Sequence, residues 1–344
     1  MFVTLLKQVQ FGGWDQDLRA AAHNVNPTIK VLSEFGWACL PSQPCDWIAN
    51  HSAAEEKARA AVALAVAREA DGINIDIEGA GQPSCKAIDL TNLVQAIRRA
   101  QSQLLPQTKR HLIINVNAFP NAISPQAGNA YNLSALANEV DIVAIMMYDM
   151  AWWNAGVPKI ATANSPLREV SAILKNLIVP PGNSSSKTQY VPAAKLLPVF
   201  PWYGYDFECN TSIFLTECMN TKPFCCGNGT AAAQISYSRV QDLLHQSNAS
   251  KVHRDKPGNL GHTPYLQKFN SSSLSPWFDY KGGDGMRHQV WFDDVQSLRA
   301  KGSLVKDLML RGHGCWTANA DYLNKLQSNH LEEQSKLFTT MEDL

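Results

Sequence analysis

The sequence lacks an excess of either charge. Its 344 residues include 30 lysines and arginines and 30 aspartates and glutamates, so the formal net charge is zero. Proteins that bind nucleic acid usually carry a basic surplus, so this balance argues against a nucleic-acid partner. Hydrophobic residues make up 45% of the chain, which is enough for one large α/β domain or two smaller ones.

The sequence also lacks a long apolar run. The Ala-rich stretch 60–67 follows Lys57 and Arg59 and precedes Arg68, so we expect a buried helix face rather than a membrane span. The apolar part of residues 1–7 is too short for a secretory signal peptide. We therefore expect no membrane insertion, and a chain that is either a fragment or has a misassigned start.

Zinc-finger spacing is absent among the eight cysteines. No pair has the C-x2-C spacing, and the four cysteines between 209 and 226 have no histidine at finger spacing. Zinc is therefore the weaker interpretation, and disulfides are favoured. Cys39 and Cys45 flank a Pro-rich loop and are candidates for a local pair, while the other pairings stay open.

Potential N-glycosylation sites point to the same compartment as disulfides. Seven N-x-S/T sequons favour the secretory pathway, and they stand at Asn50, Asn132, Asn183, Asn210, Asn228, Asn248 and Asn270.

Stretches typical of strands alternate with stretches typical of helices along the whole chain. This alternation predicts a parallel sheet covered by helices. The expected core strands are 5–11, 28–33, 72–78, 111–117, 142–148, 196–203 and 312–317. A (β/α)8 TIM barrel needs one more strand, which would precede residue 5. We therefore predict such a barrel without its first strand, and an N-terminal truncation.

The segment 204–286 is rich in Cys, Asn, Ser and Gly, and we expect it to be an insertion before the last strand within a single domain of residues 1–344. A short strand is expected at 288–292 after it. The expected helices are 15–24, 52–70, 89–104, 134–138, 166–177, 294–306 and 321–341. Ser52 and Glu55 have the spacing of a capping box at the start of the second helix.

The most informative stretch is the sequence DGINIDIEG at 71–79. Alternate side chains of a strand face opposite sides, so Asn74, Asp76 and Glu78 share one face and three isoleucines share the other. Acids this close raise one another's pKa, which favours a partner or a task for them. Glu78 ends the strand, where active sites of parallel α/β folds lie. For an isolated pair of acids, metal binding or helix capping are the alternatives.

Aromatic and acidic residues stand at the ends of other expected strands. They are Tyr148, Asp149, Trp202, Tyr203 and Trp316. Aromatic rings stack on the C–H faces of pyranose rings, and carboxylates accept hydrogen bonds from sugar hydroxyls, so this set suits a sugar. Core packing is the alternative for each tryptophan taken alone.

Taken together, four stretches resemble glycoside hydrolase family 18. They are DGINIDIEG at 71–79, MMYD at 146–149, PWYGYDFEC at 201–209, and HQVWFDD at 288–294 followed by RGHGCWTAN at 311–319. They span most of the chain and stand in the family's order. Asn74 replaces the second acid of the family signature DxxDxDxE, which departs from most chitinases. PWYGYD followed by a Cys-rich segment is more similar to exo-acting members that cleave chitobiose.

The resemblance implies a (β/α)8 catalytic domain and a retaining, substrate-assisted mechanism, for which this family is an exception to the usual two-carboxylate scheme. Glu78 would protonate the glycosidic oxygen, and the substrate's own 2-acetamido carbonyl would attack C1 to give an oxazolinium ion. Asp76 would hold the acetamide N–H, and Tyr148 would bond its oxygen. No metal ion or other cofactor is implied. The implied substrate-binding residues are Asn74, Asp149, Trp202, Tyr203 and Trp316.

The expected activity is hydrolysis of β-1,4 linkages between GlcNAc residues, in the chitobiose core of N-glycans or in short chitin oligomers. Two alternatives stay open, namely a chitinase-like lectin that binds GlcNAc oligomers with little cleavage, and an endo-chitinase. The expected partner is a GlcNAc-containing oligosaccharide. A monomeric protein, lysosomal or secreted, is expected.

Overall fold

The structure is a computed structural model, and it describes residues 16–38, 45–78, 85–105, 112–119, 131–153, 159–180, 189–210, 217–220, 232–249 and 267–317. The chain divides into two compact units. The first unit comprises residues 1–146, 173–198 and 308–314, and the second comprises 147–172, 199–307 and 315–344.

A six-stranded sheet carries the alternation that the sequence predicts. Its strand order is β1–β2–β3–β4–β6–β13, with bounds Leu32–Ala38, Gly72–Glu78, Ile113–Ala118, Ile142–Met146, Leu196–Pro201 and Gly314–Trp316. Strands β1 to β4 pair in parallel, with Leu32 opposite Gly72 and Asn74 opposite Asn115. Parallel strands joined through helices are the repeating unit of a (β/α) barrel, which confirms the predicted fold class.

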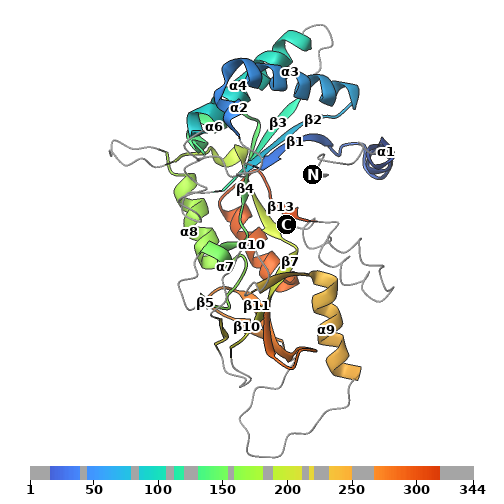
Figure 1. Cartoon of the computed structure of the whole chain (residues 1–344), viewed down its shortest axis with the longest axis vertical. Coiled ribbons are helices and arrows are strands. Elements are labelled where there is room, and N and C mark those ends of the chain that lie inside the picture. The colour runs from blue at the N-terminus through green and yellow to red at the C-terminus, as the bar shows by residue number, and fades with distance from the viewer. Residues whose placement is uncertain are drawn as a thin grey trace, which may run out of the picture. The chain divides into compact units, whose positions relative to one another are not determined.

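The helices of the first unit cover the apolar face of these strands. Figure 1 shows α3 and α4 side by side over β1 and β2. The isoleucines of β2 pack beneath this layer and are at most 1% exposed. The helices that lie wholly in the first unit are α1 (Gln16–Val25), α2 (Asp46–Ala49), α3 (His51–Ala67), α4 (Ala87–Leu104), α6 (Leu133–Glu139) and the 3-10 helix η1 (Ala193–Lys195). The Ala-rich stretch lies in α3 and buries Ala54, Ala58, Ala61, Val62 and Ala65.

The cap of α3 differs from the prediction. The side chain of Asn50 accepts a hydrogen bond from the amide of Ala53 at 3.1 Å, so Asn50 is the N-cap and the predicted Ser52–Glu55 capping box is wrong. Ser52 lies inside the first turn instead. None of the described helices combines the length and apolarity needed to cross a bilayer.

The second unit contains a five-stranded sheet of order β10–β11–β12–β7–β9 whose neighbours are all antiparallel. Figure 1 shows α9 (Tyr237–Ala249) beside this sheet. The strands are β7 (Tyr203–Glu208), β9 (Ala232–Ser236), β10 (Lys268–Asn270), β11 (Ser275–Lys281) and β12 (Arg287–Trp291). The other elements are α7 (Met150–Trp153), the strand pair β5 (Lys159–Ile160) and β8 (Met219–Asn220), and α10 (Val295–Asp307), while α8 (Leu167–Leu177) is shared between the two units.

A disulfide links Cys209 to Cys218, with Cα atoms 5.1 Å apart. This pair confirms disulfide chemistry in the predicted Cys-rich segment. Cys45 is also disulfide-bonded. Its predicted partner Cys39, like Cys225 and Cys226, lies outside the described residues.

Two expected strands differ most from the structure, and the other expected strands that the structure describes lie within two residues of their expected bounds. Strand 28–33 is wrong, because Asn26 accepts bonds from the amides of Thr28 and Ile29 in a turn, and β1 begins only at Leu32. Expected strand 196–203 is two strands, since β6 ends at Pro201 and β7 begins at Tyr203 in the other sheet. The expected strand 5–11 and helix 321–341 fall outside the described residues.

Candidate active site

Polar side chains form a continuous stripe on one face of strands β1 to β3. We call Glu34, Asn74, Asp76, Asn115 and Asn117 the polar stripe. Strand alternation puts them on one face, and the register sets Asn74 beside both Glu34 and Asn115. The Asn115 amide donates to the side-chain oxygen of Asn74, and to that of Asn117 at 3.0 Å. Hydrogen bonds thus join the three asparagines of the stripe.

Asp76 lies in the middle of this stripe. Burial raises the pKa of its carboxyl, and a hydrogen bond from Asn117 acts in the opposite direction. Its Oδ1 atom is buried and has no hydrogen-bond partner among the described residues. A buried acceptor without a donor is costly, so this atom favours a proton or a ligand group beside it.

Glu78 ends β2 and is exposed, in contrast to the buried Ile77 before it. The hydroxyl of Tyr131 donates to the carbonyl oxygen of Ile77 at 3.0 Å, which fixes the peptide group that leads into Glu78. Tyr131 is 2% exposed. Burial, and then the charges of Glu78 and Asp76, raise the pKa of the Tyr131 hydroxyl, so it remains a neutral donor.

Glu34 was not predicted from the sequence as a site residue. It lies on β1 and is 9% exposed. Its register partner on β2 is Asn74, and Asp76 lies two residues further along β2, opposite Gly36. Burial, and then the charge of Asp76, raise the pKa of Glu34 to about 7. The charge of Asp76 therefore disfavours the ionised form of Glu34 in this stripe.

Asp149 is the centre of a separate polar group in the second unit. Its φ angle is 59°, a left-handed conformation that non-glycine residues rarely adopt. The side chain of Asn164 holds it there, accepting the amide of Asp149 at 2.6 Å and donating to the carbonyl of Tyr203 at 3.3 Å. Such a conformation persists only where its surroundings fix it, which is typical of functional positions.

Two tyrosine hydroxyls donate to the same carboxylate oxygen of Asp149. They belong to Tyr203 and to Tyr205, the latter at 2.6 Å. Burial raises the pKa of Asp149, whereas these two hydrogen bonds act to lower it. The ring of Tyr148 meets the ring of Tyr203 edge-on, with centroids 6.2 Å apart. Tyr148, Asp149 and Tyr203 are thus brought together.

The predicted tryptophans are linked through their backbones. The amide of Trp202 donates to the carbonyl of Trp316 at 2.7 Å. Trp202 is 8% exposed, whereas Trp316 is partly exposed. The peptide bond between Trp316 and Thr317 is cis. Trp316 is therefore the more exposed of the two residues.

The structure divides the predicted residues between the units. Asn74, Asp76 and Glu78 belong to the first, and Tyr148, Asp149, Trp202, Tyr203 and Trp316 belong to the second. Asn74 is fully buried, so its side chain bonds within the stripe and is not accessible to solvent. The sequence reasoning missed Glu34, Asn115, Asn117, Tyr131 and Asn164, although the Asn-x-Asn spacing of β3 repeats the alternation seen in β2.

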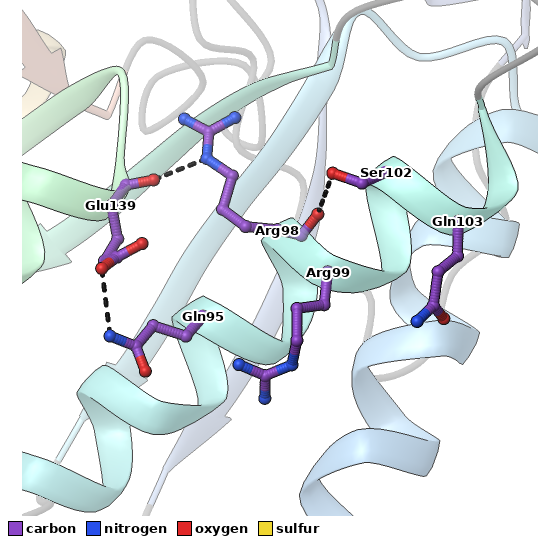
Figure 2. Close-up of a pocket in the computed structure, with 6 residues that line it drawn as sticks. All are labelled: Gln95, Arg98, Arg99, Ser102, Gln103 and Glu139. Carbon is purple, nitrogen blue, oxygen red and sulfur yellow. Dashed lines mark hydrogen bonds between the residues drawn. The ribbon is translucent and has the colours of Figure 1, made fainter.

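A surface pocket of about 400 Å³ lies elsewhere in the first unit, lined by Gln95, Arg98, Arg99, Ser102, Gln103 and Glu139. Figure 2 shows Arg98 donating to the backbone carbonyl of Glu139, and Gln95 donating to its carboxylate. Arg98 also pairs with Asp141, and Arg99 pairs with Glu55. Because both guanidinium groups have carboxylate partners, this pocket is not a strong anion site.

Known proteins resemble the chain over most of its length. Di-N-acetylchitobiase of Rattus norvegicus is 26% identical over 325 residues, covering 91% of this chain and 76% of the relative. An N-acetylglucosaminidase structure from Paenibacillus barengoltzii has a TM-score of 0.65 at 15% identity, covering 98% of this chain and 91% of that one. A chitinase-like agglutinin from Robinia pseudoacacia also has a TM-score of 0.65 at 15% identity, covering 95% and 85%. These two structures share the fold.

The family model "Glycosyl hydrolases family 18" matches residues 2–321. That range contains both the carboxylates of β2 and the Tyr148–Asp149 group described above. The chain therefore belongs to glycosyl hydrolase family 18, a family of glycoside hydrolases.

Proposed function

We propose that the protein is a retaining glycosidase that hydrolyses β-1,4 linkages between GlcNAc residues by substrate-assisted catalysis. The observation that carries the proposal is the arrangement of β2, where an exposed Glu78 ends the strand and the partly buried Asp76 lies two residues before it on the same face. The similarity to di-N-acetylchitobiase supports a short GlcNAc substrate.

Glu78 acts as the general acid, because it is the carboxyl that ends the strand in contact with solvent. The substrate's acetamido oxygen attacks C1, and the glycosidic oxygen leaves with the proton from Glu78. Asp76 accepts the acetamide N–H and stabilises the oxazolinium charge, and Tyr148 donates to the acetamido oxygen. Glu78 then takes a proton from the incoming water, which opens the oxazolinium ring and retains the configuration.

The remaining proposed residues bind the sugar. Asp149, held by Tyr203 and Tyr205, presents a fixed carboxylate to hydroxyl or amide donors. Trp316 supplies a partly exposed ring face for stacking, and Trp202 supports it through the backbone bond. The buried Asn74 acts indirectly, through Asn115.

The first test replaces Glu78 with Gln and measures GlcNAc release from N,N'-diacetylchitobiose. We expect kcat to fall by about 10³-fold or more with KM little changed, because proton transfer is lost while the shape is kept. Glu56→Gln on the exposed face of α3 is the matched control. Unchanged turnover in Glu78→Gln would remove Glu78 from the acid role.

The second test uses a substrate in which hydroxyl replaces the 2-acetamido group. Substrate assistance predicts that this compound binds but is not cleaved, because the internal nucleophile is missing. Efficient cleavage would rule out the oxazolinium route and would require a protein nucleophile.

The lectin alternative is supported by the agglutinin that shares the fold and by Asn74 in place of a signature acid. Isothermal titration with GlcNAc oligomers alongside the hydrolysis assay separates the two. Binding without release by the wild-type chain would favour the lectin. Release from chain ends or from within longer oligomers distinguishes exo from endo action.

We also infer a monomeric glycoprotein of the lysosome or the secretory pathway. The disulfide Cys209–Cys218 and the exposed sequon asparagines Asn50, Asn132 and Asn210 support this location. Shifts in mass after glycosidase treatment of protein expressed in a secretory host test it. Retention of one mass would count against glycosylation.

A further inference from the structure

The carboxyl group of Glu34 lies in the space left by the missing side chain of Gly36. A Cβ atom placed on Gly36 would lie 2.5 Å from Oε1 of Glu34, closer than such atoms approach in proteins. The carboxyl of Glu34 therefore occupies the room that a side chain at position 36 would take. Gly36 is the register partner of Asp76, so this room lies directly beside Asp76 on the neighbouring strand.

The charged groups that face Glu34 from the described residues are acids. Asp76 is its neighbour on β2, and Glu78 follows on the same face. The cations close to β1 lie on its other face, because Lys57 stands over the ring of Trp37 and Arg68 donates to Ser33. The phenol of Tyr131 is a neutral donor near both Asp76 and Glu78. No described cation is therefore placed to neutralise two carboxylates in the stripe.

We propose that Glu34 is a positioning residue that shares one proton with Asp76 and so holds the Asp76 carboxylate in a fixed orientation for the acetamido group. This inference rests on the proposed function and deepens it. The protonated carboxyl of Glu34 donates to the Oδ1 atom of Asp76, which has no other donor among the described residues. The pair then carries a single negative charge.

Two like charges in a buried site cannot both ionise readily, so one proton stays with the pair over a wide range of pH. Burial and the Asp76 charge raise the pKa of Glu34 to about 7 from its ordinary value of 4.5. An acid whose pKa is higher in the folded state binds more protons there than in the unfolded state. Stability therefore falls as pH rises between these values, and the shared hydrogen bond is lost as pH rises through about 7.

The first test needs no substrate. The melting temperatures of wild type, Glu34→Gln and the control Glu56→Gln are compared at pH 5 and pH 8. We expect the wild type and the control to lose about 3 °C more than Glu34→Gln over this interval, because only the Glu34→Gln change removes the carboxyl whose pKa is raised to about 7. Equal losses in all three proteins would overturn the proposal.

The second test compares kcat of Glu34→Gln and Glu34→Ala. At pH 5 we expect Glu34→Gln to stay within about threefold of wild type, because its amide still donates to Asp76, and Glu34→Ala to lose about tenfold in kcat with KM little changed. The ratio of kcat for Glu34→Gln to wild type should rise by about threefold from pH 5 to pH 8, since both proteins retain Glu78.

A ratio that stays constant with pH, or equal losses in the Gln and Ala variants, would overturn the positioning role. The two tests separate the failures. If wild type releases no GlcNAc, the proposed function fails, while the melting comparison still decides whether Glu34 holds the proton.

Discussion

The antiparallel sheet and the parallel sheet both bury polar side chains, but they pair them differently. In the antiparallel sheet, Asp279 accepts two bonds from Arg287, at 2.8 and 3.1 Å, and one from Gln289 at 3.1 Å. Gln289 in turn accepts the indole N–H of Trp291 at 2.8 Å. The second oxygen of Asp279 lies 3.6 Å from the ammonium of Lys268. The buried carboxylate of Asp279 therefore has two cations beside it.

In the parallel sheet, the polar stripe has acids but no facing cation among the described residues. Asp76 Oδ1, Asn74 Nδ2 and Asn115 Oδ1 are buried there without a partner in the described parts of the chain. Asp279 Oδ2 and Lys268 Nζ of the antiparallel sheet are also buried without a hydrogen bond, but they face each other as an ion pair at 3.6 Å. Buried polar atoms are normally satisfied, so the atoms of the stripe, which have no such ion pair, need an explanation. The two sheets therefore differ in charge, because the buried acid of the antiparallel network has cations beside it, whereas the acids of the stripe have none among the described residues.

The largest expected effect is a loss of stability, which follows when a mutation breaks the antiparallel network. Asp279→Ala leaves the fully buried guanidinium of Arg287 without its carboxylate, so we expect the free energy of unfolding to fall by about 3–5 kcal/mol. Urea unfolding followed by fluorescence measures it. Asp307→Ala, at an exposed position at the end of α10, is the control and should stay within about 0.5 kcal/mol. A loss below about 1 kcal/mol for Asp279→Ala would show that the network is not structural.

The matched change in the parallel stripe is Asp76→Asn. We expect kcat to fall by about 10²–10³-fold, because the stabilising charge is lost. The free energy of unfolding at pH 7 should not fall, since burial raises the pKa of Asp76 and a neutral amide avoids that penalty. Kinetics and unfolding on the same preparation check both parts. A destabilised but fully active variant would reverse the comparison.

Tyr205→Phe tests the group around Asp149. The variant removes one of two hydroxyl donors to a partly buried carboxylate, so we expect about 1–2 kcal/mol less stability and a several-fold higher KM. The same change at the partly exposed Tyr190 is the control. If Tyr205→Phe leaves both quantities unchanged, Asp149 is held by Tyr203 and Asn164 alone.

The smallest effect concerns His288, which lies between Asp206 at 2.9 Å and Asp284 at 3.2 Å. The hydrogen bond to Asp206, chiefly, raises the pKa of His288 to about 9 from 6.5. Its contribution is therefore fully present below pH 6.5 and is lost as pH rises through about 9, by about 1 kcal/mol after solvent screening. His288→Asn should flatten the pH dependence of unfolding, and His51→Asn, at an exposed position of α3, is the control.

Much of the parallel sheet could be predicted because its signal is local. The expected strand 72–78 has the bounds of β2, since three isoleucines alternate with three polar residues. Helix α1 was predicted within about one residue for the same reason, an uninterrupted local pattern. Period and composition are sufficient where one face of an element is buried.

The antiparallel sheet could not be predicted in the same way. Its strands β7, β9 and β12 pair across long stretches of chain, and no local pattern gives a partner over that distance. Glu34 was missed because its place near Asp76 follows from the register with β2, which no local sequence pattern indicates. The shared face of the β2 carboxylates could be predicted from the sequence, whereas the polar residues beside them come from neighbouring strands.

Gly36 restricts which residues related sequences can have at positions 34 and 36. Because the Glu34 carboxyl fills the space above Gly36, a larger residue at 36 would require the Glu34 side chain to move away from its present place. Related sequences should therefore change the two positions together, with glycine at 36 tied to an acid or its amide at 34. A lineage that has lost the acid is released from the glycine, and such paired replacements would mark relatives whose reaction depends differently on pH.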